Sequence, residues 1–244
     1  SRINRRTAHI PGITNFFLSN RLTSRILKNL LGFAPERKLP LLYKTTLKTY
    51  LKRSKDLKPN GSKEGKKVYL FVDEFTDYND VEIGIKAAAL LVKLGYQVEV
   101  PEHEISGRTY LSKGLIKEAK EFAISNVNML KDVISEKTPL IGIEPSAILS
   151  FRDEYPDLVG KELKEAAIVL GKSALMFDEF IASEIDEGHI SNSHFTKESR
   201  RIKLHGHCHQ KAIASIKPTV RMLSLPEYYK VEEINSGCCG MAGS

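Results

Sequence analysis

The chain has 244 residues, of which 41% are hydrophobic and 27% charged, and its formal net charge is +7. This composition is sufficient for a sizeable core in one large unit or two small ones. The sequence contains neither the long apolar run of a membrane span nor the apolar segment of a signal peptide, so we expect neither. Because it does not begin with methionine, we expect it to be part of a longer polypeptide.

The positive charge is concentrated toward the N-terminus. Residues 1–67 contain 17 Lys/Arg against 3 Asp/Glu, whereas residues 68–244 contain 20 against 27. A basic arm on an acidic body is typical of a docking segment, and the partner can be the body itself. The arm lacks the glycine-rich loops and aromatic platforms that bind nucleic acid, so nucleic acid is not an expected partner.

The arm is expected to form two helices, over residues 13–31 and 40–53, followed by a polar linker over residues 56–67. An apolar stripe runs along the first helix. We expect this stripe to pack within the chain or against another domain, and the alternative is peripheral contact with an anionic membrane surface. The stripe consists of Phe16, Phe17, Leu22, Ile26 and Leu30.

From residue 68 onward, short apolar runs alternate with helical patterns. Strands joined by helical crossovers pair in parallel, which predicts an α/β body. The expected strands are residues 68–72, 97–100, 140–143, 202–205 and 231–234. The expected helices are residues 80–94, 111–134, 157–170, 172–187 and 210–224.

Residues 68–107 and residues 202–240 follow the same order of elements. Each has a strand, a polar loop, a helix, a second strand and a short motif that ends in glycine. Phe75 and Ser106 are 31 positions apart, as are Cys208 and Cys239. We therefore predict two pseudo-repeated βαβ units with mostly parallel strands, preceded by the helical basic arm. Both loops of such a unit lie at the carboxyl ends of the strands, where ligands bind, so the two cysteine-bearing loops are expected to converge.

The predicted organisation has three parts. Residues 1–64 form the arm and linker, residues 65–152 the first repeat without thiols, and residues 153–244 the second repeat.

All three cysteines lie near the C-terminal end. Cys208 is flanked by His207 and His209, and Cys238 and Cys239 are adjacent. Adjacent cysteines rarely pair with each other, because that disulfide requires a strained peptide. Thiols beside imidazoles are instead typical of a soft-metal site, so these five residues are our candidate metal ligands. The alternatives are three free thiols, or a cysteine nucleophile with a histidine base.

An odd number of cysteines without a disulfide-scaffold spacing fits a reducing compartment, which predicts a cytoplasmic location. The sequence contains neither of the glycine-rich motifs that cradle the phosphates of nucleotides. Nucleotide binding is therefore not expected within this chain.

The thiol segments resemble a known family. Residues 205–211 (HGHCHQK) and 236–244 (SGCCGMAGS) are similar to the cysteine-rich CCG domain of heterodisulfide reductase B subunits, anaerobic glycerol-3-phosphate dehydrogenase C subunits and the iron–sulfur parts of glycolate and D-lactate oxidoreductases. Three further segments resemble the C-terminal region of FAD-linked oxidases. These segments are residues 32–40 (GFAPERKLP), 71–76 (FVDEFT) and 142–154, which include GIEPS and RDE.

The resemblance implies an iron–sulfur electron-transfer domain of a larger flavin-linked oxidoreductase that acts on a 2-hydroxy acid. FAD would then be bound in a preceding part of the parent, next to a ferredoxin-like segment, and the acceptor would be a quinone or another electron carrier. The implied cofactor is an iron–sulfur cluster, held by Cys208, Cys238 and Cys239. The alternative is a zinc-binding or metal-free assembly module, and the chain alone is not expected to be catalytic.

Three departures from the family pattern stand out. The first repeat has Ile105-Ser106-Gly107-Arg108 where the family has thiols, Ala147 takes the place of a further cysteine, and no cysteine follows Cys239. A fully loaded cluster is therefore not expected from this sequence alone.

Other polar residues near these motifs have less specific patterns. Glu144 and Arg152 are expected to form a helix cap or structural ion pair, with a site-lining pair as the alternative. Lys211 is expected near a negatively charged cluster or in solvent, and residues 102–104 (EHE) in an exposed loop. Because His207 and His209 would lie on opposite sides of an extended segment, at most one is expected to face the metal.

Overall fold

The computed structural model describes residues 10–54 and 65–237. Its centre is a four-stranded sheet in the order β2-β1-β3-β4, and all neighbouring strands are parallel. The α/β class and the parallel pairing predicted from the sequence are therefore confirmed. The strands are β1 (Lys67–Phe71), β2 (Gln97–Glu99), β3 (Leu140–Gly142), β4 (Ala174–Met176), β5 (Arg200–Leu204) and β6 (Tyr229–Glu233).

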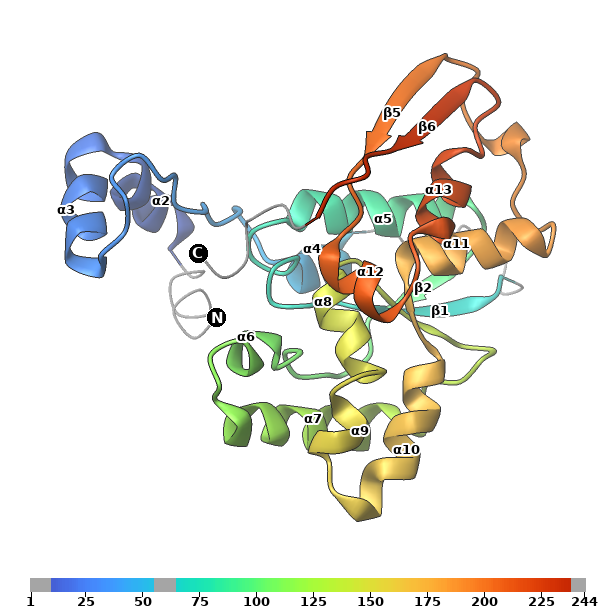
Figure 1. Ribbon diagram of the computed structural model, residues 1–244, viewed down its shortest axis with the longest axis horizontal. Helices are drawn as coiled ribbons and strands as arrows, with labels where there is room; N and C mark the ends of the chain where they lie inside the picture. The colour runs from blue at the N-terminus through green and yellow to red at the C-terminus, as the bar shows by residue number, and fades with distance from the viewer. Residues whose placement is uncertain (1–9, 55–64, 238–244) are drawn as a thin grey trace.

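Helices cover both faces of this sheet, with α7, α9 and α10 on one side and α5 and α11 on the other (Figure 1). Leu140 of β3 belongs to the first of these apolar clusters and Ile141 to the second, because successive strand residues point to opposite faces. The helices of the body are α5 (Val81–Lys93), α6 (Arg108–Leu111), α7 (Ile116–Leu130), α8 (Pro145–Ile148), η1 (Leu149–Phe151), α9 (Tyr155–Leu158), α10 (Lys161–Lys172), α11 (Phe177–Asp186), η2 (Asn192–His194), α12 (Cys208–Ile213) and α13 (Lys217–Leu223).

The expected helix over residues 172–187 is wrong at its start, where strand β4 lies. Ala174 and Met176 are buried, and β4 pairs with β3 in register. A three-residue strand directly followed by a helix has too little sequence to show a period of its own. The expected helix over residues 111–134 also begins later, since Gly114 adopts a left-handed conformation with φ 71° just before α7.

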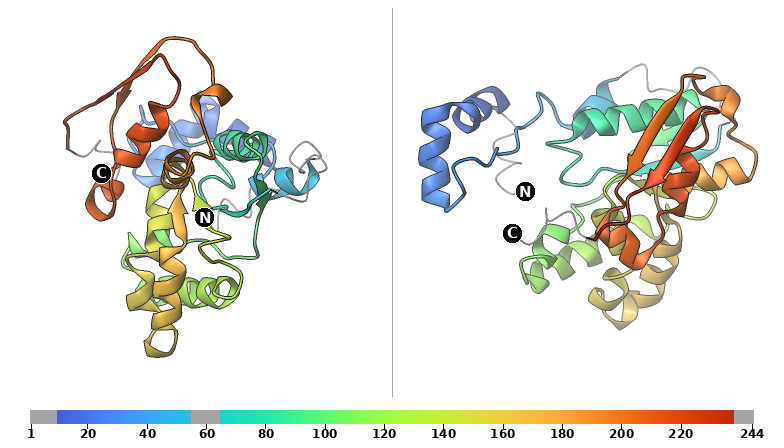
Figure 2. Two further views of the ribbon diagram at one scale, coloured as in Figure 1. Left: turned by 90° about the vertical axis from the view of Figure 1, so that its right-hand side faces the viewer. Right: turned by 45° about the horizontal axis from the view of Figure 1, so that its top comes forward.

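Strands β5 and β6 form a separate, parallel two-stranded ribbon that projects from the body (Figures 1 and 2). Their residues are exposed or half-buried. The single helix expected between them, over residues 210–224, is in fact two helices, α12 and α13, interrupted around Ala214. The first unit, β1-α5-β2, lies within the four-stranded sheet instead.

The arm contains α2 (Pro11–Ser19), α3 (Arg21–Leu31) and α4 (Leu47–Arg53). The helix expected over residues 13–31 is divided at Asn20, whose side chain accepts hydrogen bonds from the backbone of Leu22 and Thr23 and so caps α3. The side-chain amide of Asn15 forms two hydrogen bonds with the backbone of Leu42, one as donor and one as acceptor. These bonds attach the segment between α3 and α4 to α2.

The apolar stripe of the arm does not pack within the described part of the chain. Its exposure ranges from 51% at Phe17 to 80% at Leu30. Helices α2 and α3 contact each other and lie apart from the body (Figures 1 and 2). Of the expected modes of packing, contact with another domain remains a prediction for these residues. Among the described residues, no helix is long and apolar enough to cross a membrane.

Gly171 of α10 provides a test of the packing between α10 and η1. A Cβ atom at this position would lie 2.6 Å from the backbone carbonyl oxygen of Phe151. Although alanine normally favours a helix over glycine, we expect Gly171→Ala to lower the free energy of unfolding by about 1–3 kcal/mol through overpacking. Chemical denaturation would measure the change. The control Gly12→Ala, where nothing lies within 4 Å, should cause no loss; equal effects would contradict the packing argument.

Candidate metal centre and its surroundings

Residues 205–211, here called the thiol loop, follow β5. Their cysteine and its two flanking histidines lie at the start of α12. His207 is the residue before the helix, Cys208 is its first residue, and Cys208 is exposed. The extended geometry expected for residues 207–209 is therefore wrong at Cys208 and His209, which are helical. Neighbouring helical residues do not face each other, so Cys208 and His209 point in different directions.

Hydrogen bonds tie the thiol loop to the segment that precedes the other two cysteines. His205 Nε2 lies 3.0 Å from the carbonyl oxygen of Gly237, the residue immediately before Cys238 in the sequence. Lys211 donates to the carbonyl oxygens of Ser236 and Gly237, at 2.9 and 3.3 Å. Lys211 thus binds backbone rather than lying free in solvent. Cys238 and Cys239 themselves lie outside the described residues.

His207 contacts α8, the short helix after β3. Its Nε2 atom lies 3.8 Å from Glu144 Oε1. The Glu144 carboxylate also accepts hydrogen bonds from the backbone nitrogen and the hydroxyl of Ser146, at 3.2 and 2.6 Å, and so caps α8. Ala147, at the position where the resembling family has a cysteine, is buried in the apolar core below the sheet.

Glu144 and Arg152 do not pair with each other. Arg152 instead binds both carboxylate oxygens of Glu179, at 2.9 and 2.5 Å, and donates to the carbonyl of Ala174. The expected helix cap is thus present at Glu144, whereas the ion pair of Arg152 is formed with Glu179, a partner that was not predicted.

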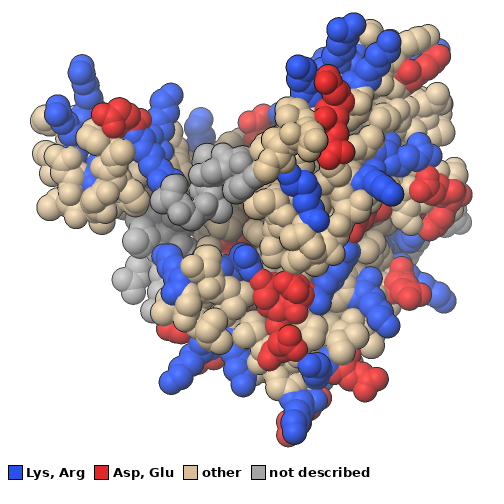
Figure 3. Space-filling view, in the orientation of Figure 1, with Lys and Arg blue, Asp and Glu red and all other residues tan. Residues whose placement is uncertain are grey.

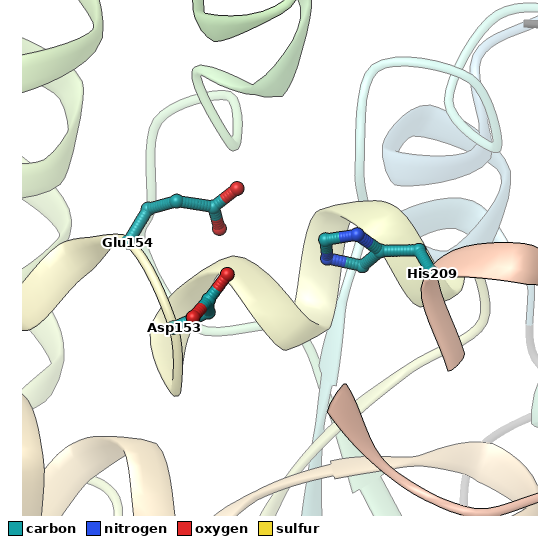
Figure 4. Close-up of side chains that lie close together, drawn as sticks. All are labelled: Asp153, Glu154 and His209. Atoms are coloured by element: carbon teal, nitrogen blue, oxygen red, sulfur yellow. The ribbon is translucent and has the colours of Figure 1, made fainter. Parts of the chain in front are cut away.

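His209 faces two carboxylates at the start of α9. One ligand atom from each of His209, Asp153 and Glu154 lies within 4.8 Å of the others, and the three side chains point into the same space (Figure 4). The Arg108 guanidinium forms an ion pair with Glu154 Oε1. Burial lowers the pKa of the His209 imidazole, and the positive charge of Arg108 lowers it further. The negative charges of Glu154 and Asp153 act on this pKa in the opposite direction. The neutral imidazole is the form that ligates metals.

In the first unit, which has no thiols, a buried hydrogen-bonded pair joins the loop after β1 to the loop after β2. Ser106 is fully buried, and its backbone nitrogen and hydroxyl donate to the Glu74 carboxylate at 3.0 and 2.9 Å. Glu74 also accepts a 3.5 Å hydrogen bond from Thr109. Glu74 was not predicted from the sequence as a site residue. Its position directly after the apolar strand β1, at the carboxyl end of a parallel sheet, was the available signal.

The expectation of an exposed loop at residues 102–104 is wrong for His103, which is buried beneath Phe71. Its Nε2 accepts a hydrogen bond from the backbone of Val72 at 3.3 Å, so its Nδ1 donates to the carbonyl of Glu104 at 2.7 Å. Burial, followed by the positive charge of Lys48, lowers the pKa of His103 to about 3. His103 is therefore a neutral structural residue.

Comparisons with known proteins point to dehydrogenases. The chain is similar to a D-2-hydroxyglutarate dehydrogenase of Pantoea ananatis, with 25% identity over 97% of this chain and 23% of the relative. It is 23% identical to the C subunit of the anaerobic glycerol-3-phosphate dehydrogenase of Escherichia coli, over 70% of this chain and 42% of that protein. It is also 25% identical to lactate utilization protein A of Bacillus subtilis, over 73% of this chain and 74% of that protein.

The chain thus spans 23% of the length of the D-2-hydroxyglutarate dehydrogenase. No protein-family model matches the sequence. No solved structure matches it at a significant level.

The buried Glu74 carboxylate should contribute to the stability of the protein by joining the loop after β1 to the loop after β2. In Glu74→Gln, an amide NH₂ replaces one acceptor oxygen and leaves a buried donor of Ser106 or Thr109 without its partner. We expect this to lower the free energy of unfolding by about 1–3 kcal/mol. Thermal or chemical denaturation would measure the loss, with Glu104→Gln, at an exposed position, as the control. Equal stability of the two variants would rule out a structural role for Glu74.

Proposed function

We propose that this chain is an electron-transfer part of a larger flavin-linked oxidoreductase, and that Cys208, Cys238 and Cys239 bind an iron–sulfur cluster. The observation that carries this proposal is the attachment of Gly237 to the thiol loop by His205 and Lys211. Gly237 directly precedes Cys238 in the sequence.

The comparisons support an oxidoreductase context. Two of the relatives are named as dehydrogenases, of D-2-hydroxyglutarate and of glycerol 3-phosphate, and a third is named for lactate utilization. D-2-hydroxyglutarate and lactate are both 2-hydroxy acids, which is the substrate class we assign to the parent enzyme. Oxidation of such an acid releases two electrons, and a flavin can pass them on one at a time.

The donor set suits a soft metal centre. Thiolates are the ligands of iron–sulfur clusters, and three of them leave one iron of a four-iron cluster open to a further ligand. When bound, such a cluster accepts and releases single electrons. The chain's own contribution is to hold Gly237 beside the loop that carries Cys208, and to keep Cys208 at the surface, where an electron donor can approach.

A zinc-binding assembly module is the second candidate. His207 lies 3.8 Å from the Glu144 carboxylate, and a carboxylate beside an imidazole is the usual outer partner of a zinc-ligating histidine. With three thiolates, His207 would complete a tetrahedral zinc site.

The partners we propose are flavin and ferredoxin-like domains of the same polypeptide or complex. Exposed apolar residues on α2 and α3 support this, since monomeric proteins rarely expose so many together. In Figure 3, Lys and Arg also gather over these helices. We retain the division of the body into two pseudo-repeats, residues 65–152 and 153–244, as part of the proposal. The sheet is continuous across that boundary, because β3 pairs with β4.

Anaerobic reconstitution with iron and sulfide tests the function. We expect iron and acid-labile sulfide in nearly equal amounts, an iron–sulfur absorption and EPR spectrum, and loss of both in Cys208→Ala. Lys211→Met should reduce cluster content by removing the hydrogen bonds to Ser236 and Gly237, while its control Lys217→Met should not.

The other results discriminate between the alternatives. Binding of zinc without iron would favour the assembly module. Failure of the wild-type chain to retain either metal would contradict the metal-centre proposal.

A further inference from the structure

The described residues contain two buried side-chain atoms without a hydrogen-bond partner, and both belong to one cluster. They are Glu154 Oε2 and His209 Nε2. Both atoms are therefore available to a ligand, because no group of the described residues forms a hydrogen bond with either.

The cluster has the composition of a site for a divalent cation. His209, Asp153 and Glu154 offer one imidazole nitrogen and two carboxylate oxygens within 4.8 Å of one another. Ligand atoms around zinc lie about 2.0–2.2 Å from the ion, hence up to about 4 Å apart, so small side-chain movements suffice to close the site. Figure 4 shows the two carboxylates and the imidazole directed toward a common centre.

The surrounding charges fit this assignment. Arg108 binds Glu154 through Oε1 and thereby orients the carboxylate, while Oε2 remains available. Asp153 and Glu154 together carry two negative charges and Arg108 one positive charge, so the cluster retains one negative charge.

We infer that Asp153, Glu154 and His209 form a zinc site that is separate from the thiol centre. Its donors are harder than thiolates, and an imidazole with two carboxylates is a donor set that zinc accepts. The site uses no cysteine, so it stands whether or not the chain binds an iron–sulfur cluster. It also makes His207, rather than His209, the imidazole available to the thiols.

Titration with Co²⁺, a spectroscopic substitute for zinc, separates the two centres. The triple variant Cys208→Ser/Cys238→Ser/Cys239→Ser removes every thiol of the chain. In this variant we expect cobalt to give visible ligand-field bands without the thiolate charge-transfer bands of the near ultraviolet. Zinc should displace the cobalt and abolish the bands.

Carboxylate variants in the same thiol-free background identify the ligands. Asp153→Asn and Glu154→Gln should each weaken cobalt and zinc binding by about tenfold or more. Asp153 is exposed, so its variant should remain folded even if loss of the Arg108 ion pair destabilises Glu154→Gln. The control Asp157→Asn, at an 81% exposed acid of α9 paired with Lys164, should leave binding unchanged.

Two results would overturn the inference. One is the absence of cobalt bands from the thiol-free protein, which would mean that water satisfies the two buried atoms. The other is binding of equal strength in Asp153→Asn and the control. Neither result would bear on iron–sulfur binding, which is measured on the intact thiols.

Discussion

The arrangement of the candidate centre depends on the parallel pairing of the strands. In a parallel sheet, every strand ends at the same edge, so the loops that follow the strands meet there although they are distant in sequence. The loop with Glu74 follows β1, the loop with Ser106 follows β2, and Glu144 follows β3. The ribbon of β5 and β6 repeats the arrangement, because its parallel strands bring the thiol loop and Gly237 to one end.

Contacts between side chains then connect the loop after β2 to the thiol loop. Tyr155 donates a 2.9 Å hydrogen bond to the carbonyl of Ser106, and the neighbouring Glu154 pairs with Arg108. Glu154 in turn lies beside His209 at the start of α12. The loop that lacks thiols is therefore a support for the loop that has one, since its buried hydrogen bonds fix the position of Arg108.

The sequence was sufficient to predict features that depend on a pattern over many residues. It was not sufficient for features that depend on a single contact, such as a helix cap or the burial of one side chain. Apolar runs with helical crossovers were sufficient for the α/β class and for β1, β2, β3, β5 and β6, because that pattern extends over many residues. By contrast, α2 and α3 separate where one side chain, Asn20, caps a helix. The burial of His103 and the acidic neighbours of His209 result from packing between distant segments. The local sequence pattern contains no information on such contacts. The position of Glu74 after a predicted strand, by contrast, could have identified it as a candidate site residue.

Helix geometry explains how two adjacent residues can serve different ligands. Consecutive residues of an α-helix project about 100° apart, so Cys208 and His209 cannot easily bind the same small ion. Cys208 is exposed, whereas the ring nitrogen of His209 is buried against carboxylates. A soft thiolate and a harder nitrogen–oxygen set would select different metals even when both are present. In the proposed arrangement, the first turn of α12 would therefore present Cys208 to a surface cluster and His209 to a separate cation beside Asp153 and Glu154.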